Sequence, residues 1–167
     1  MTTDFSVRRA RTPDVRAIRD LVEPMSQSGR IVVKDAVTYY EAVHEFRVVE
    51  VDGVVVGCGA LHVMWEDVAE VRTVAVHPAY TKHGLGSALL TTLLHDAKEL
   101  GVARVFCLTF ETAFFAHHGF VTIEGQAVDP EVYVELLRSY DEGVAEFLDL
   151  ERVKPNTLGN TRMLLTL

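Results

Sequence analysis

Apolar residues follow two different periodicities along this chain. Alternation with a period of two, or a short run of β-branched residues, is typical of strands, and apolar residues three and four positions apart are typical of amphipathic helices. The first pattern predicts strands over 5–8, 46–51, 54–64, 68–76, 103–109, 120–123 and 162–167. The second predicts helices over 13–24, 36–44, 84–100, 112–118 and 130–148. The order of elements is that of an α/β (α+β) fold with a β-meander in its first half.

Local signals support several of these boundaries. Thr12 is the predicted N-cap of the first helix, with Pro13 at its first position. The pair Asp52–Gly53 between two β-branched runs predicts a β-hairpin. The last predicted helix carries one apolar face, made of Val132, Leu136, Tyr140 and Val144.

Length and composition limit the number of domains and the classes of partner. The chain has 167 residues, 49% of them hydrophobic, which is enough for one core and too short for two ordinary domains. Its 24 acidic residues outnumber the 16 basic residues, so no global positive field attracts nucleic acid or an anionic membrane. An anionic ligand would therefore be bound by local groups.

The N-terminal residues and the cysteines favour a cytoplasmic protein. Residues 1–14 are charged and have no apolar stretch, so no secretory signal is predicted. No apolar run reaches the roughly 18 residues that a membrane helix needs. Cys58 and Cys107 lie far apart in apolar runs, which is typical of buried free thiols, with a disulfide between them as the alternative. The chain has no HExxH motif and His117 and His118 are adjacent, so no metal site is predicted.

The stretch from Val74 to Gly86 is the most informative for chemistry, because its Gly-x-Gly pair lies directly before a helix. The first N–H groups of a helix have no intrahelical partners and the helix dipole is positive there, so they can bind a pyrophosphate. Gly84 and Gly86 allow close approach of the backbone, while Lys82 and His83 add positive charge. The alternative is a tight turn that needs glycine. The third glycine of a dinucleotide fold and the Gly-Lys-Ser/Thr of a nucleotide P-loop are absent.

Three segments together resemble the GNAT N-acetyltransferase superfamily: the strand Glu70–Val76, the loop that ends at Gly86, and Phe114–Phe120. The order of elements agrees over residues 5–125. The resemblance implies one GNAT domain over 5–167, with a mixed twisted sheet whose fourth and fifth strands splay apart, flanking helices, and a C-terminal helix–strand extension from about 126. It also implies acetyl-CoA as co-substrate and no metal.

The same resemblance assigns acetyl-CoA to two parts of the chain. The pantetheine arm would pair with the backbone of the fourth strand at Val74, Ala75 and Val76. The pyrophosphate would bind the loop and the first helical turn, which comprise Lys82, His83, Gly84, Leu85, Gly86 and Ser87. Thr81 stands where the family usually has Arg or Gln.

Acetyl transfer to an amine needs a neutral nucleophile, so a base within hydrogen-bond reach is useful. Glu70 lies six residues before Val76, which puts both on one strand face by the period of two. Similar acetyltransferases place a glutamate base there, so Glu70 is the candidate base, directly or through a water molecule. The alternative is a solvated carboxylate at the edge of the sheet.

The departing thiolate has no obvious proton donor in this sequence. A tyrosine often protonates it in this family, but Phe115 occupies that position. Cys107, His117 and His118 are donors by sequence position alone, and a core thiol and two surface imidazoles are the alternative interpretation. No acid is assigned.

Six segments carry a narrower resemblance, over 31–34, 40–46, 57–61, 69–78, 105–110 and 154–165. They resemble short, stand-alone N-acetylglutamate synthases. The resemblance implies acetyl transfer to the α-amine of L-glutamate, the first step of arginine biosynthesis. Longer versions carry an amino-acid-kinase-like domain for arginine feedback, and we expect this chain to lack that regulator. Acetyl transfer to glutamine or another small amine, and a non-catalytic acetyl-CoA sensor, are the alternatives.

A glutamate substrate brings two carboxylates, which Arg and Lys bind best. The candidate ligands are Lys34, Arg72 and Arg162, with Asn160 beside the last strand. The alternatives are a solvated loop charge for Lys34, an ion pair with Glu70 for Arg72, and a surface strand position for Arg162. The sequence leaves formation of a homodimer open.

Overall fold

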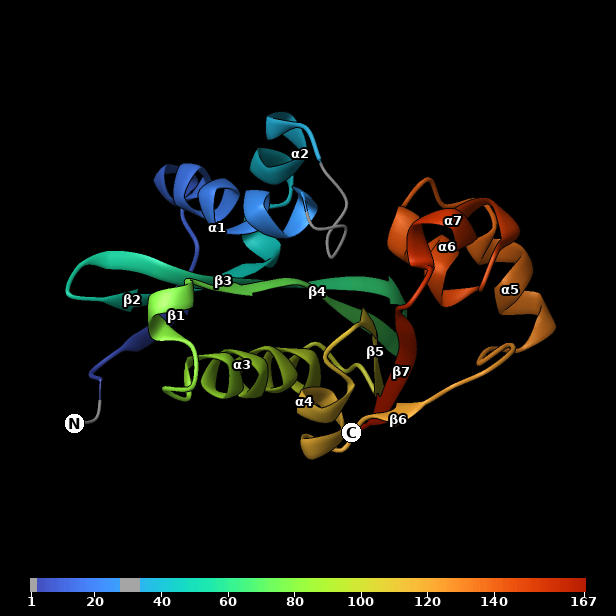
Figure 1. Ribbon diagram of the computed structural model, residues 1–167. Coiled ribbons are helices and arrows are strands. Elements are labelled where there is room, and N and C mark those ends of the chain that lie inside the picture. The colour runs from blue at the N-terminus through green and yellow to red at the C-terminus, as the bar shows by residue number, and fades with distance from the viewer. Residues whose placement is uncertain (1–2, 28–33) are drawn as a thin grey trace. The chain divides into compact units, whose positions relative to one another are not determined.

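The computed structural model describes residues 3–27 and 34–167, and over these residues its strands form one mixed sheet (Figure 1). The strands are β1 (Ser6–Arg9), β2 (Phe46–Val51), β3 (Val54–Trp65), β4 (Val68–Val76), β5 (Arg104–Thr109), β6 (Val121–Thr122) and β7 (Thr161–Thr166). Their order in the sheet is β1-β2-β3-β4-β5-β7-β6. The pair β4–β5 is parallel, whereas β1–β2, β2–β3, β5–β7 and β6–β7 are antiparallel. The α/β fold with a mixed sheet is therefore confirmed.

The helices lie between these strands in the chain. They are α1 (Val15–Gln27), α2 (Ala36–Glu41), α3 (Leu85–Glu99), α4 (Thr112–His117), α5 (Pro130–Leu136), α6 (Glu142–Phe147) and α7 (Lys154–Thr157). Short 3₁₀ turns are η1 (Thr12–Asp14), η2 (Val43–Glu45), η3 (Pro78–Tyr80) and η4 (Glu151–Val153). The chain divides into two compact units, one of residues 1–62 and 71–96 and the other of residues 63–70 and 97–167.

The first unit packs helices on both faces of its strands, with α1 and α2 on one face of β2 and β3 and α3 on the other (Figure 1). Helix α1 buries Val15, Ile18 and Val22, which lie three and four positions apart, against strand residues that include Val48 and Cys58. The periodicity that predicted this helix thus marks its buried face.

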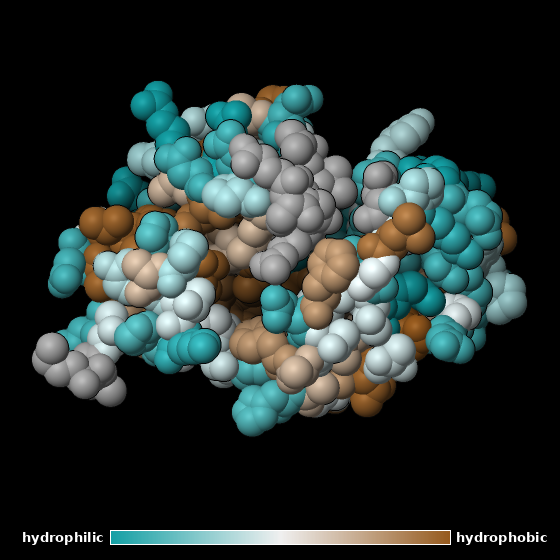
Figure 2. Space-filling model, viewed as in Figure 1, coloured by the Kyte–Doolittle hydropathy of each residue, from teal (hydrophilic) through white to brown (hydrophobic). Residues whose placement is uncertain are grey.

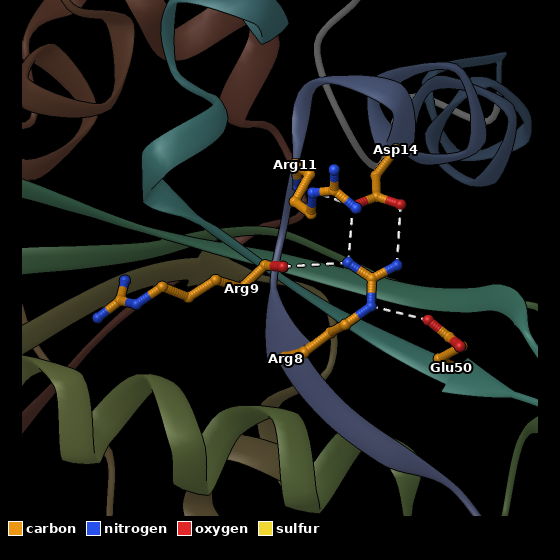
Figure 3. Close-up of polar contacts among 5 residues, drawn as sticks. All are labelled: Arg8, Arg9, Arg11, Asp14 and Glu50. Carbon is orange, nitrogen blue, oxygen red and sulfur yellow. Dashed lines mark hydrogen bonds and ion pairs between the residues drawn. The ribbon is translucent and has the colours of Figure 1, made fainter.

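An ion-pair network joins three elements of the first unit (Figure 3). Arg8 on β1 donates two hydrogen bonds to the carboxylate of Asp14, at 2.8 and 3.0 Å, and one to Glu50 on β2 at 2.7 Å. The same carboxylate of Asp14 accepts the backbone N–H of Arg11 at 2.7 Å. Arg11 is therefore the N-cap of this segment, and the prediction of Thr12 was wrong by one residue.

The second unit buries a cluster around β5 and the C-terminal helices. Phe106 on β5 and Phe147 on α6 are both almost fully buried, and their rings meet edge to face with centroids 5.1 Å apart. Leu136 and Val144 complete the helical side of this cluster. Hydrophilic residues cover most of α5–α7 on the face shown in Figure 2. These helices are therefore amphipathic.

The predicted helix over 130–148 is wrong in its middle, because two helices occupy this range. Helix α5 ends at Leu136 and α6 starts at Glu142. The Ser139 hydroxyl accepts the Asp141 N–H at 3.1 Å, and the Asp141 carboxylate accepts the Val144 N–H at 3.0 Å, so a new helix is capped here. Tyr140, predicted on the buried face, is 99% exposed.

Other boundaries differ less. The first helix continues past Pro24 to Gln27, and the helix predicted over 36–44 ends at Glu41 and is followed by η2. The turn η4 and helix α7 were not predicted. The remaining strands and helices lie within two residues of their predicted bounds. Both cysteines are buried and free, as predicted.

Candidate functional site

Strand β4 leaves the extended conformation in its middle. Thr73 has φ of +58° and is 9% exposed. A positive φ is a genuine outlier for a β-branched residue. Burial nevertheless alternates from Val71 to Val76, with positions 71, 73 and 75 buried and positions 72, 74 and 76 half-buried, so the placing of Glu70 and Val76 on one face stays a prediction. No sequence signal marks Thr73, since threonine is common in strands.

The residues expected to contact pantetheine directly follow Thr73. Val74 and Val76 are half-buried and Ala75 is 1% exposed. The register between β4 and β5 joins Val68, Ala69 and Glu70 to residues 104–106. Residues 74–76 lie beyond that register.

The glycine loop has a backbone suited to anion binding. Lys82 and Gly84 have φ of +66° and +81°, and a left-handed residue beside right-handed ones turns successive N–H groups toward one point. A side chain placed on Gly84 would meet nothing within 4 Å, so the loop is open here. Ala88 N–H donates to the Gly84 carbonyl at 3.1 Å, which makes Gly84 the N-cap of α3.

Below the loop, Leu85 is 1% exposed and anchors the start of α3 in the core. Lys82 and His83 are exposed, whereas Gly86 and Ser87 are half-buried. The start of α3 is therefore held in the core by Leu85, while the loop residues before it are open to solvent. This arrangement fits a pyrophosphate bound by backbone N–H groups.

A capped turn leads into this loop. The Nδ1 atom of His77 accepts the N–H of Ala79 at 3.1 Å, and the Thr81 hydroxyl donates to the Pro78 carbonyl at 3.1 Å. The side chain at the position where the family usually has Arg or Gln thus bonds locally to the turn. His77 was not singled out from the sequence, although a histidine before a proline turn is a recognisable cap.

Glu70 is a buried carboxylate, only 3% exposed, so it is not a solvated edge residue. It lies on β4 opposite Phe106 of β5. Burial raises the pKa of the neighbouring Cys107 thiol, and the charge of Glu70 raises that pKa further. Glu70 therefore lies close enough to Cys107 for its charge to act on that thiol, and its role as base stays a prediction.

Two of the proton donors considered from the sequence, Cys107 and His118, gain no support. Cys107 is 1% exposed and its raised pKa makes its thiol a weak acid. Burial and the charge of His117 lower the pKa of His118, which disfavours its protonated form. Phe115 is buried against Phe114 and Phe120.

The four expected carboxylate ligands lie on different elements. Lys34 precedes α2, and residues 31–33 before it lie outside the described residues. Arg72 is on β4, next to Thr73, and Asn160 directly precedes β7. All three are half-buried. Lys34 is therefore not fully solvated.

Arg162 on β7 binds backbone carbonyls. Its Nε donates to the Glu146 carbonyl at 3.1 Å, and its Nη2 donates to the carbonyls of Gly125 and Phe147. Two of these carbonyls belong to the last turn of α6, where a cation is favourable. Burial lowers the pKa of Arg162. The guanidinium thus ties α6 to β7, and its Nη1 takes no part in these three bonds.

Over the residues that the structure describes, no group of three or more His, Cys, Asp or Glu side chains could hold a metal ion. In the same part of the chain, no helix has the length and apolar character needed to cross a membrane.

The sequence pattern of the acetyltransferase (GNAT) family matches residues 16–120, more than half of the chain. The chain belongs to the GNAT family. An amino-acid acetyltransferase of Mycobacterium tuberculosis is 60% identical to this GNAT chain over 165 residues, which cover 96% of this chain and 94% of that protein.

Two solved structures resemble the whole chain. A Mycobacterium tuberculosis crystal structure in complex with CoA and NLQ matches with a TM-score of 0.94 and 59% identity, covering 97% of this chain and 99% of that one. N-acetylglutamate synthase of Neisseria gonorrhoeae, complexed with coenzyme A and N-acetyl-glutamate, matches with a TM-score of 0.78 and 23% identity. That match covers 100% of this chain and 36% of the synthase, and it supports the fold.

This GNAT chain is therefore an acetyl-CoA-dependent N-acetyltransferase. The glycine loop before α3 lies within the matched region, and so do β4 and Glu70. The resemblance stated from the sequence is confirmed. The roles of individual residues stay predictions.

Proposed function

We propose that this chain transfers the acetyl group of acetyl-CoA to the α-amine of L-glutamate, giving N-acetylglutamate and CoA. The observation that carries the proposal is the amino-acid acetyltransferase that is 60% identical over nearly the whole of both chains. The narrower sequence resemblance to N-acetylglutamate synthases, which extends to the tail at 154–165, favours glutamate as the amino acid.

Acetyl-CoA is proposed to bind the first unit through backbone groups. The pyrophosphate lies against Lys82–Ser87, where two positive-φ residues and the positive end of the α3 dipole suit an anion in a chain of net charge −8. The pantetheine arm pairs with the backbone of Val74–Val76. In this proposal, neutral backbone N–H groups bind the charged acetyl-CoA, and no extended basic surface is needed.

The proposed reaction is direct attack by the amine on the thioester. The amine nitrogen forms a bond to the carbonyl carbon, the C–S bond breaks, and CoA leaves as the thiolate. Glu70 accepts the proton that the amine loses, directly or through one water molecule. Because Phe115 stands at the position of the usual tyrosine, another acid or solvent protonates the thiolate, or the thiolate leaves unprotonated.

Lys34, Arg72, Asn160 and Arg162 are proposed to bind the glutamate carboxylates. For Arg162 the bonds to backbone carbonyls fix the side chain, and Nη1 contacts a carboxylate. A guanidinium held by three carbonyls loses little conformational entropy when it binds a ligand.

We also propose the pathway step, the cellular location and the domain extent of this chain. We place the product at the first step of arginine biosynthesis, the protein in the cytoplasm, and all of residues 5–167 in one domain with an extension from about 126. We leave a homodimer as a proposal that sedimentation would test.

The experiment that tests the function measures CoA release from acetyl-CoA with a thiol reagent. Glutamate, glutamine, other amino acids and a polyamine serve as acceptors, and mass spectrometry identifies the product. Selective release with glutamate supports the proposal. CoA release with another acceptor would mean that this acceptor, and not glutamate, is the substrate. Binding of acetyl-CoA with no CoA release would indicate a non-catalytic sensor.

A further inference from the structure

The segment Gly57–Cys58–Gly59 on β3 contacts β4 around Thr73, the residue with positive φ. The thiol of Cys58 donates a hydrogen bond to the carbonyl oxygen of Thr73, with 3.5 Å between Sγ and O. The backbone of Ala75 forms a hydrogen bond with the same thiol. Cys58 is fully buried, and burial raises its pKa to about 12, so the thiol keeps its proton. One side chain therefore contacts the backbone on both sides of Val74.

The two glycines that flank Cys58 allow this close approach. A Cβ on Gly59 would lie 3.3 Å from Cγ2 of Val74 and 3.1 Å from Cδ1 of Leu93. A Cβ on Gly57 would lie 3.1 Å from Cγ2 of Val49 on β2, and at an ordinary contact distance of 3.5 Å from the carbonyl oxygen of Ala75. A side chain at Gly59 would therefore crowd β4 and α3, and one at Gly57 would crowd β2; glycine within a strand is typical of such close approach.

The backbone at Thr73 is unfavourable without support. A left-handed conformation is strained for a β-branched residue such as Thr73 and persists only where the surroundings hold it. The Cys58 thiol bonds to the carbonyl of this same residue. Because the acceptor is a backbone carbonyl oxygen, the hydrogen bond constrains the backbone conformation of β4 rather than the position of a side chain.

We propose that Cys58 is a positioning residue that holds the left-handed backbone of Thr73 and thereby orients the backbone of Val74–Val76 for acetyl-CoA. The inference rests on the proposed use of these residues by the pantetheine arm. The requirement at position 58 is a small side chain with a hydrogen-bond donor, between two glycines.

Three substitutions separate the hydrogen bond from packing. Cys58→Ser keeps a donor of similar size, Cys58→Ala removes the donor and leaves space, and Cys58→Val removes the donor while filling the space. Because a buried hydroxyl costs more than a methyl group in an apolar core, packing alone would favour Val over Ser. Val48→Ala is the matched control, since Val48 is fully buried and lies opposite Cys58 on β2.

The measurements use the full chain. Calorimetry gives the Kd for acetyl-CoA, and steady-state kinetics give the KM of each substrate. We expect Cys58→Ala and Cys58→Val to raise the acetyl-CoA Kd and KM about three- to ten-fold, the effect of losing one hydrogen bond. Cys58→Ser stays close to the wild type, the KM of the amino acid is unchanged in all three, and Val48→Ala lowers the melting temperature without changing the Kd.

A second measurement, amide hydrogen exchange, reports on the backbone of β4 even where a variant is too unstable for kinetics. Amide hydrogen exchange at Thr73–Val76 is followed by NMR in the protein without ligand, and we expect faster exchange in Cys58→Val than in Cys58→Ser. Equal exchange in the two, or an acetyl-CoA Kd in Cys58→Val equal to that of the wild type, overturns the inference. So does an equal loss of affinity in Val48→Ala. None of these readouts needs glutamate as acceptor, so a different acceptor overturns the proposed function while leaving this inference testable.

Discussion

At the scale of single residues, Glu70 on β4 combines a carboxylate with almost complete burial. Glu70 was placed on a strand from its spacing, yet its burial depends on β5 lying opposite, which is a contact between distant segments. The positive φ of Thr73 leaves no trace in residue order, and its contact with Cys58 joins residues 15 positions apart. The place of the glycine loop at the start of α3 was predictable, because a Gly-x-Gly pair before an apolar helical pattern is a local signal.

The role of Glu70 as base makes a direct prediction. Glu70→Gln keeps the shape of the side chain and removes the proton acceptor, so we expect kcat to fall about 10²- to 10⁴-fold while the acetyl-CoA KM stays within about two-fold. Steady-state kinetics with both substrates give these values. The matched control is Glu66→Gln, at an exposed position between β3 and β4. Unchanged kcat in Glu70→Gln would remove Glu70 from the mechanism.

Arg162 combines a structural and a binding role, and the two can be separated. Arg162→Ala leaves the carbonyls of Gly125, Glu146 and Phe147 without this donor, so we expect a loss of about 1–3 kcal/mol in the free energy of unfolding. We also expect the glutamate KM to rise far more than the acetyl-CoA KM. Urea unfolding and steady-state kinetics measure the two effects. Equal changes in both KM values would show that Arg162 is structural only.

At the scale of elements, hydrophobic periodicity predicted most helices and strands, because each one buries a single face. The hairpin at Asp52–Gly53 was also predictable, and both residues have positive φ, 50° and 79°, as this turn requires. The prediction failed over 130–148 because apolar residues continue at helical spacing through a stretch that local hydrogen bonds interrupt. Ser139 and Asp141 were the signal that was available and was missed.

The break between α5 and α6 predicts opposite results for two neighbouring residues. Asp141→Ala removes the cap of α6, so we expect the free energy of unfolding to fall by about 1 kcal/mol. Tyr140→Ala should change it by less than about 0.5 kcal/mol, because Tyr140 is 99% exposed. Chemical unfolding of both variants is the test. A continuous helix would give the reverse order, with the larger loss at Tyr140.

At the scale of the whole molecule, net charge excluded classes of partner but did not predict how the acidic and basic residues pair. Arg8 and Asp14 are six residues apart and Glu50 is much further along the chain, so the network between them depends on β1 pairing with β2. The two compact units were also not evident from the sequence, since strands β3 and β4 each contribute to both. Such features depend on long-range contacts rather than on local pattern.

The network at Asp14 predicts how global stability depends on pH. The hydrogen bonds from Arg8 hold the pKa of Asp14 below its usual value, so ionised Asp14 contributes stability above its unfolded pKa of about 3.9. This contribution is lost as the pH falls through the lower pKa of the folded state. We expect Asp14→Asn to cost about 1–2 kcal/mol at pH 7, a value reduced by the partial exposure of Arg8.

Urea unfolding of the wild type and of Asp14→Asn, at pH 7 and at successive values below pH 4, measures this difference directly. We expect the two unfolding curves to converge as the pH falls, because protonated aspartic acid and asparagine are both neutral. Asp20→Asn on the exposed side of α1 is the control, and it should follow the wild type at every pH. A difference between wild type and Asp14→Asn that stays constant down to the lowest pH would mean that shape, and not charge, is what Asp14 contributes to the network.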